Sequence, residues 1–156
     1  MEFGDIARRG LVLLGCGKMG GALLQGWIGQ GMDKSAVWVV DPAPSGELSA
    51  LVGANLNADL PASPAIVVVA VKPQMMDAAL ESVRRFGGRK DTLFLSVAAG
   101  TTLETFETAL GSSTPVIRAM PNTPAAIGRG ITALVRNGRV SAPGRDRGRE
   151  LRCAVS

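Results

Sequence analysis

Residues 11–20 read Leu11-Val12-Leu13-Leu14-Gly15-Cys16-Gly17-Lys18-Met19-Gly20, an apolar run that leads directly into a glycine loop. The spacing of the glycines is that of the fingerprint G-x-G-x-x-G, found between a strand and a helix. Gly15 permits a tight turn, Gly17 lets a pyrophosphate approach the backbone, and Gly20 lets the helix pack closely. The stretch therefore predicts a dinucleotide whose pyrophosphate binds at the N-terminus of a helix.

A carboxylate ends the next apolar run. Asp41 follows Gly20 by 21 residues, where the fingerprint places an acid at the end of the second strand. Such an acid accepts hydrogen bonds from the hydroxyls of the adenosine ribose. A chain with 20 glycines produces some glycine patterns by chance, but here the strand, the helix and the downstream acid agree. Their agreement favours a dinucleotide site.

Composition limits the class of protein. The chain has 156 residues, 46% of them hydrophobic, which is enough for one domain with a sizeable core. Its longest apolar run, Ala65 to Val71, is far shorter than the roughly 20 residues of a membrane span. Residues 1–10 do not resemble a signal peptide. We therefore expect a single cytoplasmic domain with no membrane partner.

The reactive side chains exclude several kinds of chemistry. Cys16 and Cys153 provide neither a disulfide framework nor the spacing of metal ligands. The sequence has no histidine and no tyrosine, which removes histidine proton transfer, Ser-His triads and the commonest metal ligand. We expect no metal site.

The net charge of +4 is concentrated near the C-terminus. Residues 139–156 contain five arginines and two acids, which leaves +1 for residues 1–138. This Gly/Arg-rich tail has no aromatic residue for stacking and no nucleic-acid module. We therefore predict no nucleic-acid partner, a dinucleotide-binding domain over 1–138, and a solvated or disordered tail over 139–156.

Apolar β-rich runs alternate with segments of helical period, which is the pattern of a parallel sheet with crossover helices. The expected strands are Gly10–Leu14, Ala36–Val40, Ala65–Val71, Thr92–Val97, Val116–Ala119 and Thr132–Val135. The expected helices are Met19–Ile28, Ser45–Val52, Met75–Phe86 and a fourth that follows Thr101 as N-cap, with Glu104 completing a capping box. The run Ile66 to Val71 does not alternate, as expected of a strand buried on both faces. The predicted fold is α/β, with a doubly wound, mostly parallel sheet of the Rossmann type.

Three further segments lie at predicted strand ends, where open α/β sheets bind their ligands. They are Ala70-Val71-Lys72-Pro73, Ser96-Val97-Ala98-Ala99-Gly100 and Met120-Pro121-Asn122-Thr123-Pro124. Each segment alone is compatible with an ordinary turn at the end of a strand. However, small residues at these positions would let a flat nicotinamide ring lie close to the backbone. Together with the glycine loop, and in this order, they resemble pyrroline-5-carboxylate reductase. The resemblance extends from Leu11 to Val135 of this sequence.

The resemblance implies an NAD(P)H-dependent oxidoreductase that reduces 1-pyrroline-5-carboxylate to L-proline, the last step of proline biosynthesis. The cofactor performs the hydride chemistry, and the protein supplies position and electrostatics. The implied cofactor contacts are Leu14, Gly15, Cys16, Gly17, Lys18, Met19, Asn57, Ala70, Val71, Lys72, Pro73, Val97, Ala98 and Ala99, beside Gly20 and Asp41 from the fingerprint. Two of these keep a structural alternative: Asn57 as a loop residue that satisfies backbone groups, and Lys72 as a lysine snorkelling at a strand end.

Asp41 departs from the pattern of this family, many of whose members prefer NADPH and end the second strand in smaller or neutral residues. A carboxylate repels a ribose 2′-phosphate, and no arginine follows within the next several residues to bind that phosphate. The cofactor is thus NADPH or NADH, and we predict a preference for NADH.

The family continues into a helical second domain that forms the dimer and builds the imine site with a Ser-Gly-Ser-Gly-Pro segment. After Pro143 this sequence instead reads Gly-Arg-Asp-Arg-Gly-Arg-Glu-Leu-Arg-Cys-Ala-Val-Ser, a poor helix. We therefore hypothesise a shifted reading frame near Pro143, no catalytic residue within this chain, and a monomer. The alternatives are a fragment that binds a dinucleotide but is catalytically incompetent, and a reductase of another cyclic imine.

Overall fold

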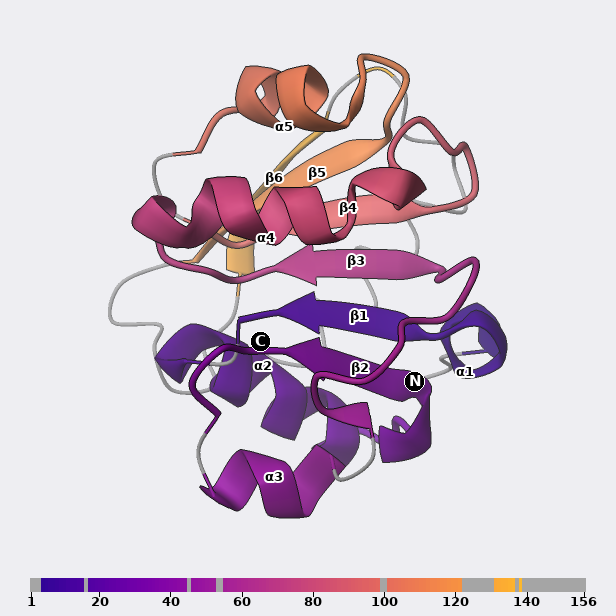
Figure 1. Ribbon diagram of the computed structural model, residues 1–156, viewed down its shortest axis with the longest axis vertical. Helices are drawn as coiled ribbons and strands as arrows, with labels where there is room; N and C mark the ends of the chain where they lie inside the picture. The colour runs from indigo at the N-terminus through magenta and orange to yellow at the C-terminus, as the bar shows by residue number, and fades with distance from the viewer. Residues whose placement is uncertain are drawn as a thin grey trace.

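The computed structural model describes residues 4–15, 17–44, 46–52, 55–98, 101–121, 131–136 and 138. Within them, one six-stranded sheet has the order β2-β1-β3-β4-β5-β6 (Figure 1). The strands are β1 (Leu11–Leu14), β2 (Val37–Val40), β3 (Ile66–Val69), β4 (Leu93–Ser96), β5 (Val116–Pro121) and β6 (Ile131–Arg136). Strands β1 to β5 pair in parallel, and β6 pairs antiparallel with β5. The predicted doubly wound, mostly parallel fold is confirmed.

Helices cover both faces of this sheet (Figure 1). The α-helices are α1 (Gly4–Arg9), α2 (Lys18–Gly29), α3 (Gly46–Val52), α4 (Met76–Ser82) and α5 (Leu103–Leu110). Short 3₁₀ turns cover η1 (Lys34–Ala36), η3 (Pro73–Met75) and η4 (Arg84–Phe86). Buried side chains of α1, α2 and α3 share one apolar cluster, and those of α4 and α5 share a second cluster on the opposite face.

Strand β3 joins these two clusters. Ile66 and Val68 belong to the first cluster, and Val67 and Val69 belong to the second. All four side chains are fully buried, so this strand has no polar face and its sequence cannot alternate. Burial of each such side chain is worth about 1.5–3 kcal/mol. The prediction of a strand buried on both faces is confirmed for Ile66–Val69, whereas Ala70 and Val71 lie beyond the strand and are half-buried.

The helix predicted over Met75–Phe86 is shorter in the structure. Helix α4 ends at Ser82, because Val83 leaves the helical conformation with φ −119° and ψ 12°, and η4 follows. This break lets both Val83 and Phe86 be fully buried. The Arg85 guanidinium lies 4.8 Å from the centroid of the Phe86 ring and covers it. Tertiary burial thus overrides the continuous helical period.

The predicted N-cap of α5 is wrong by one residue. Thr102, not Thr101, caps the helix, and its hydroxyl accepts a hydrogen bond from the Thr105 N–H at 3.2 Å. Thr101 is buried, whereas Thr102 is exposed at the point where its hydroxyl reaches the third helical N–H. Glu104 therefore contributes to the first turn through the helix dipole and does not complete a capping box with Thr101.

Helix α1 was not predicted. Its one fully buried apolar side chain among the described residues is Ile6, and it ends where the Gly10 N–H binds the Ile6 carbonyl at 2.7 Å. Gly10 has φ +97°, so it terminates α1 and does not begin the strand as predicted. A side chain at Gly10 would also meet the Trp38 ring at 2.7 Å.

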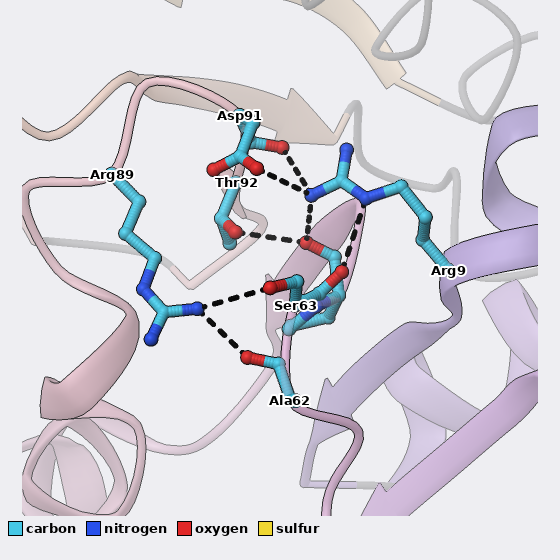
Figure 2. A network of polar contacts seen from close by, with 7 residues as sticks. Arg9, Ala62, Ser63, Arg89, Asp91 and Thr92 are labelled. Carbon is cyan, nitrogen blue, oxygen red and sulfur yellow. Dashed lines mark hydrogen bonds and ion pairs between the residues drawn. The ribbon is translucent and has the colours of Figure 1, made fainter.

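Polar contacts fasten the end of α1 to two loops at the amino ends of β3 and β4 (Figure 2). Arg9 donates from Nε to the Ser63 carbonyl at 3.1 Å and from Nη2 to the Pro64 and Asp91 carbonyls at 3.1 and 2.8 Å. The same Nη2 lies 3.4 Å from the Asp91 carboxylate. The buried Thr92 hydroxyl donates to the Pro64 carbonyl at 2.8 Å. These contacts fix the amino ends of three neighbouring strands.

The predicted tail over 139–156 lies outside the described residues, so its division from the domain stays a prediction. No helix in the described ranges combines the length and the apolar character that a bilayer span requires.

Candidate dinucleotide-binding site

The carboxyl ends of the four parallel strands β1 to β4 lie together at one end of the sheet, called the carboxyl edge below. Backbone hydrogen bonds between neighbouring strands continue beyond the last residues of these strands. The Gly15 N–H donates to the Val40 carbonyl at 2.8 Å, and the Ala70 N–H donates to the Leu14 carbonyl at 2.8 Å. The Val97 N–H donates to the Val69 carbonyl at 3.0 Å. The predicted site segments after β1, β2, β3 and β4 therefore lie side by side at this edge, which is where open α/β sheets bind ligands.

The three glycines of the loop differ in their surroundings. Gly15 has φ +80°, and a Cβ there would meet Val71 Cγ1 at 2.8 Å, so only glycine fits the turn. A Cβ on Gly20 would fall on the Gly15 carbonyl oxygen, so α2 packs directly against the loop backbone. A Cβ on Gly17 would meet nothing within 4 Å. The space above Gly17 is open, as a bound pyrophosphate requires.

Helix α2 begins immediately after this open position. Gly17 is its N-cap and provides no side-chain cap, and the first turn carries no acidic residue. The N–H groups of this turn, which a helix leaves without intrahelical partners, therefore keep the positive end of the dipole uncompensated by side chains. Lys18 and Met19 form the start of this turn. The loop and the helix end together fit a pyrophosphate.

Asp41 follows β2 directly and lies next to the glycine loop, since Val40 binds Gly15. Its Oδ1 accepts a hydrogen bond from the Ala43 N–H at 2.9 Å, which closes a turn after the strand. The Asp41 N–H donates to Asn57 Oδ1 at 2.8 Å, and Asn57 Nδ2 donates back to the Asp41 carbonyl at 2.8 Å. The structure thus brings together Asp41 and Asn57, both of which were predicted to contact the cofactor.

Asn57 fulfils the structural alternative considered for it, because its side chain satisfies two backbone groups. It has φ +52° and is the only non-glycine with positive φ among the described residues. Asparagine tolerates this left-handed conformation better than most residues. The role of Asn57 as a direct cofactor contact remains a prediction.

The segments after β3 and β4 supply small and exposed groups. Ala70 and Val71 are half-buried, whereas Lys72 and Pro73 are exposed, with Pro73 opening η3. Val97 is buried, and the half-buried Ala98 donates its N–H to Ser96 Oγ at 3.2 Å. Ser96 belongs to the segment singled out in the sequence, but it was not among the expected cofactor contacts, and its hydrogen bond to Ala98 was not predicted. Ser96 fixes the start of the segment that lies beside Ala70.

Some predicted positions cannot be placed. Cys16 and Ala99 lie outside the described residues, as does the Asn122-Thr123-Pro124 segment. In the parts of the chain that the structure describes, no group of three or more His, Cys, Asp or Glu side chains is arranged to bind a metal ion.

A glycine loop between β1 and α2, an acid after β2 and strand ends aligned on one edge define a Rossmann-type dinucleotide-binding domain. The chain belongs to the family described as NADP oxidoreductase coenzyme F420-dependent, whose model matches residues 10–100.

Comparison with known proteins confirms the resemblance to pyrroline-5-carboxylate reductases. The chain is 38% identical to the Escherichia coli enzyme over 135 residues, which cover 82% of this chain and 49% of that protein. It is 32% identical to the Pseudomonas aeruginosa enzyme over 151 residues, covering 93% of this chain and 55% of that protein. The chain therefore spans about half the length of the curated relatives it matches.

Solved structures agree with this fold. A pyrroline-5-carboxylate reductase from Coxiella burnetii superposes with a TM-score of 0.84 at 26% identity, covering 95% of this chain and 57% of that one. The Plasmodium falciparum pyrroline carboxylate reductase with NADP bound superposes with a TM-score of 0.74 at 21% identity, covering 96% of this chain and 56% of that one.

Proposed function

We propose that this chain supplies the dinucleotide-binding half of a pyrroline-5-carboxylate reductase, which reduces 1-pyrroline-5-carboxylate to L-proline in proline biosynthesis. The observation that carries the proposal is the alignment of Gly15, Ala70 and Val97 along one sheet edge, fixed by backbone hydrogen bonds. The identity to curated reductases supplies the substrate. The reduced nicotinamide, when bound, supplies the hydride.

The residues of the chain would bind and orient this cofactor. The backbone at Gly15 and Gly17 and the first turn of α2 would hold the pyrophosphate. Ala70 and Ala98 leave room at the edge for a flat ring, and the exposed Lys72 adds positive charge there. We assign no catalytic residue to this chain, and we propose that the imine site and the dimer interface belong to the second domain of the family.

We further propose that the site prefers NADH. The Asp41 carboxylate would accept hydrogen bonds from the ribose hydroxyls and would repel the additional phosphate of NADPH. Solved structures of similar fold have been determined with either cofactor: the P. falciparum reductase with NADP bound, and an imine reductase from Myxococcus stipitatus, at 22% identity, in complex with NAD+. The fold therefore does not decide between them, and the preference depends on Asp41.

The first experiment measures binding by titrating the 156-residue chain with NADH and with NADPH while following nicotinamide fluorescence. We expect saturable binding of both, with NADH the tighter. Failure to bind either dinucleotide would refute the proposed function, and NADPH binding at least as tightly would refute the preference alone.

The second experiment adds 1-pyrroline-5-carboxylate and follows the absorbance of the reduced cofactor. We expect the chain by itself to bind cofactor without oxidising it above background. Turnover would contradict the assignment of the imine site to a second domain and would show that this chain is a complete reductase.

A further inference from the structure

Asn57 lies in a short segment that runs along the free edge of β2 in the described sheet. Leu56 forms an isolated parallel bridge with Val39, and the Asn57 N–H donates to the Val39 carbonyl at 2.8 Å. The segment is held at both ends by asparagine side chains. Asn55 Nδ2 donates to the Ser35 and Val37 carbonyls at 2.9 and 3.1 Å, and Asn57 pairs with Asp41.

The two asparagines bind backbone groups at opposite ends of β2. Asn55 satisfies the carbonyls of Ser35 in η1 and Val37 at the start of β2, at the other end of that strand from Asp41. Asn57 binds both the N–H and the carbonyl of Asp41, so it fixes the peptide groups on either side of that residue's Cα. The Asp41 carboxylate is then held from its other side by the Ala43 N–H. The backbone and the side chain of Asp41 are therefore both constrained.

Backbone strain supports a specific role for Asn57. For most residues other than glycine a left-handed conformation costs about 1–2 kcal/mol, and asparagine adopts it more readily because its short polar side chain can bond to nearby backbone groups. With φ +52°, Asn57 presents its carboxamide to the Asp41 backbone, and the two hydrogen bonds that it forms there stabilise the left-handed conformation. Glycine would adopt the same φ without strain but would supply neither bond.

From this geometry we infer that Asn57 is a positioning residue for cofactor selection: it orients Asp41, and through Asp41 it sets the preference for NADH over NADPH. The inference rests on the proposed function, because it requires that the site bind a dinucleotide. Its physical basis is preorganisation. A carboxylate whose direction is fixed before binding discriminates more strongly between a ribose hydroxyl and a ribose phosphate than a mobile one does.

The test compares Asn57→Gly with Asn55→Ala in the full chain. Each variant removes two side-chain hydrogen bonds from the same segment, so both lower the thermal unfolding midpoint. We expect only Asn57→Gly to change selectivity, lowering the ratio of the NADPH and NADH dissociation constants by about threefold or more. Asn55→Ala should leave that ratio unchanged.

The Asp41→Ser background separates positioning from direct contact. If Asn57 acts through the Asp41 carboxylate, Asn57→Gly changes the ratio in the wild-type chain and leaves it unchanged beside Asp41→Ser. An equal change in both backgrounds, or no change in the wild type, overturns the inference while leaving dinucleotide binding intact. Loss of binding in the wild type itself would instead refute the proposed function, and the inference with it.

Discussion

At the amino ends of β1, β3 and β4, arginine side chains bind main-chain carbonyls, whereas past the carboxyl ends of the same strands the chain continues through small or apolar residues, Gly15, Ala70 and Val97-Ala98. Arg9 alone donates to three carbonyls, and Arg89 donates to the Ala62 carbonyl and the Ser63 hydroxyl at 2.7 and 3.3 Å (Figure 2). At the other edge, the space at Gly17 is open.

We expect this difference to separate residues that determine stability from residues that determine binding within one sheet. Groups at the amino edge satisfy each other, so changes there should alter the free energy of unfolding and leave cofactor affinity unchanged. In the proposed site, groups at the carboxyl edge would provide space and N–H donors for the dinucleotide, so we expect changes there to alter affinity. The predictions below test whether the two edges are independent in this way.

Arg9→Ala should have the largest effect. The substitution removes three hydrogen bonds to carbonyls and one ion pair, and hydrogen bonds from a charged donor are worth about 1.5–3 kcal/mol. We expect a loss of about 2–3 kcal/mol in the free energy of unfolding, measured by urea denaturation. The dissociation constant for NADH should not change.

Arg84→Ala is the matched control. Its ion pair with Glu81 is 3.5 Å long, and both side chains are mostly exposed, so about 0–1 kcal/mol is at stake. Equal destabilisation by Arg9→Ala and Arg84→Ala would mean that the carbonyl contacts of Arg9 contribute little. Weaker NADH binding in Arg9→Ala would show that the edges are coupled.

Gly17→Ala should have the opposite effect to Arg9→Ala: it should weaken cofactor binding and leave stability unchanged. Gly17 has a negative φ of −72° in an extended conformation, and a Cβ there would enter open space. Stability should therefore be unchanged, but the methyl group would occupy the space expected for the pyrophosphate. We expect NADH affinity to fall by about tenfold, or 1.4 kcal/mol, in a fluorescence titration.

Gly29→Ala serves as the control for Gly17→Ala, because a Cβ there also meets nothing within 4 Å but lies at the far end of α2. It should stabilise the helix by about 0.5–1 kcal/mol and leave affinity unaltered. Wild-type affinity in Gly17→Ala would remove the glycine loop from the proposed site.

Thr92→Val tests a single contact at the amino edge. The substitution preserves shape but removes the buried hydroxyl that donates to the Pro64 carbonyl. Because Arg9 still binds that carbonyl, the loss should be about 1 kcal/mol. Thr92→Ser, which keeps the hydroxyl, should lose less in the same urea titration. A greater loss for Ser would mean that the methyl group, and not the hydrogen bond, stabilises this position.

The sequence predicted the strand ends and the glycine loop because their signals are local. Apolar runs such as Ile66–Val69 and the spacing from Gly15 to Gly20 are visible without knowledge of partners. The Arg9 contacts join residues 54, 55 and 82 positions apart, and nothing in the neighbourhood of Arg9 indicates them. A helix as short as α1 likewise depends on tertiary contacts more than on propensity.

The same reasoning applies to the candidate site. Asp41 was singled out because it ends an apolar run at a fixed distance from the glycines. The pairing of Asn57 with the Asp41 backbone spans 16 residues and needs a left-handed φ, which no local pattern specifies for asparagine. Sequence reasoning therefore proposed both residues as cofactor contacts without finding the hydrogen bonds between them.

Asp33→Asn should have the smallest effect on stability, and it tests the amino edge through the pH dependence of the free energy of unfolding. The Ser35 backbone N–H and hydroxyl donate to its carboxylate at 2.9 and 2.8 Å, and the N–H contributes most to lowering the pKa of Asp33 below its ordinary value of 3.8. A carboxyl whose pKa is lower in the folded state stabilises the fold above its unfolded pKa, and that contribution is lost as pH falls through the folded value. Stability should therefore decrease slightly more on acidification in the wild type than in Asp33→Asn.

Urea denaturation at neutral pH and near pH 3 measures this difference. Asparagine keeps an oxygen that accepts from Ser35 but does not titrate, so the two proteins should differ more at neutral pH than in acid. Because Asp33 precedes β2 at the amino edge, NADH affinity at neutral pH should be the same in both proteins. Identical pH dependence would assign the acid sensitivity of this edge to other carboxylates, whereas a change in affinity would show that the start of β2 influences Asp41 at its end.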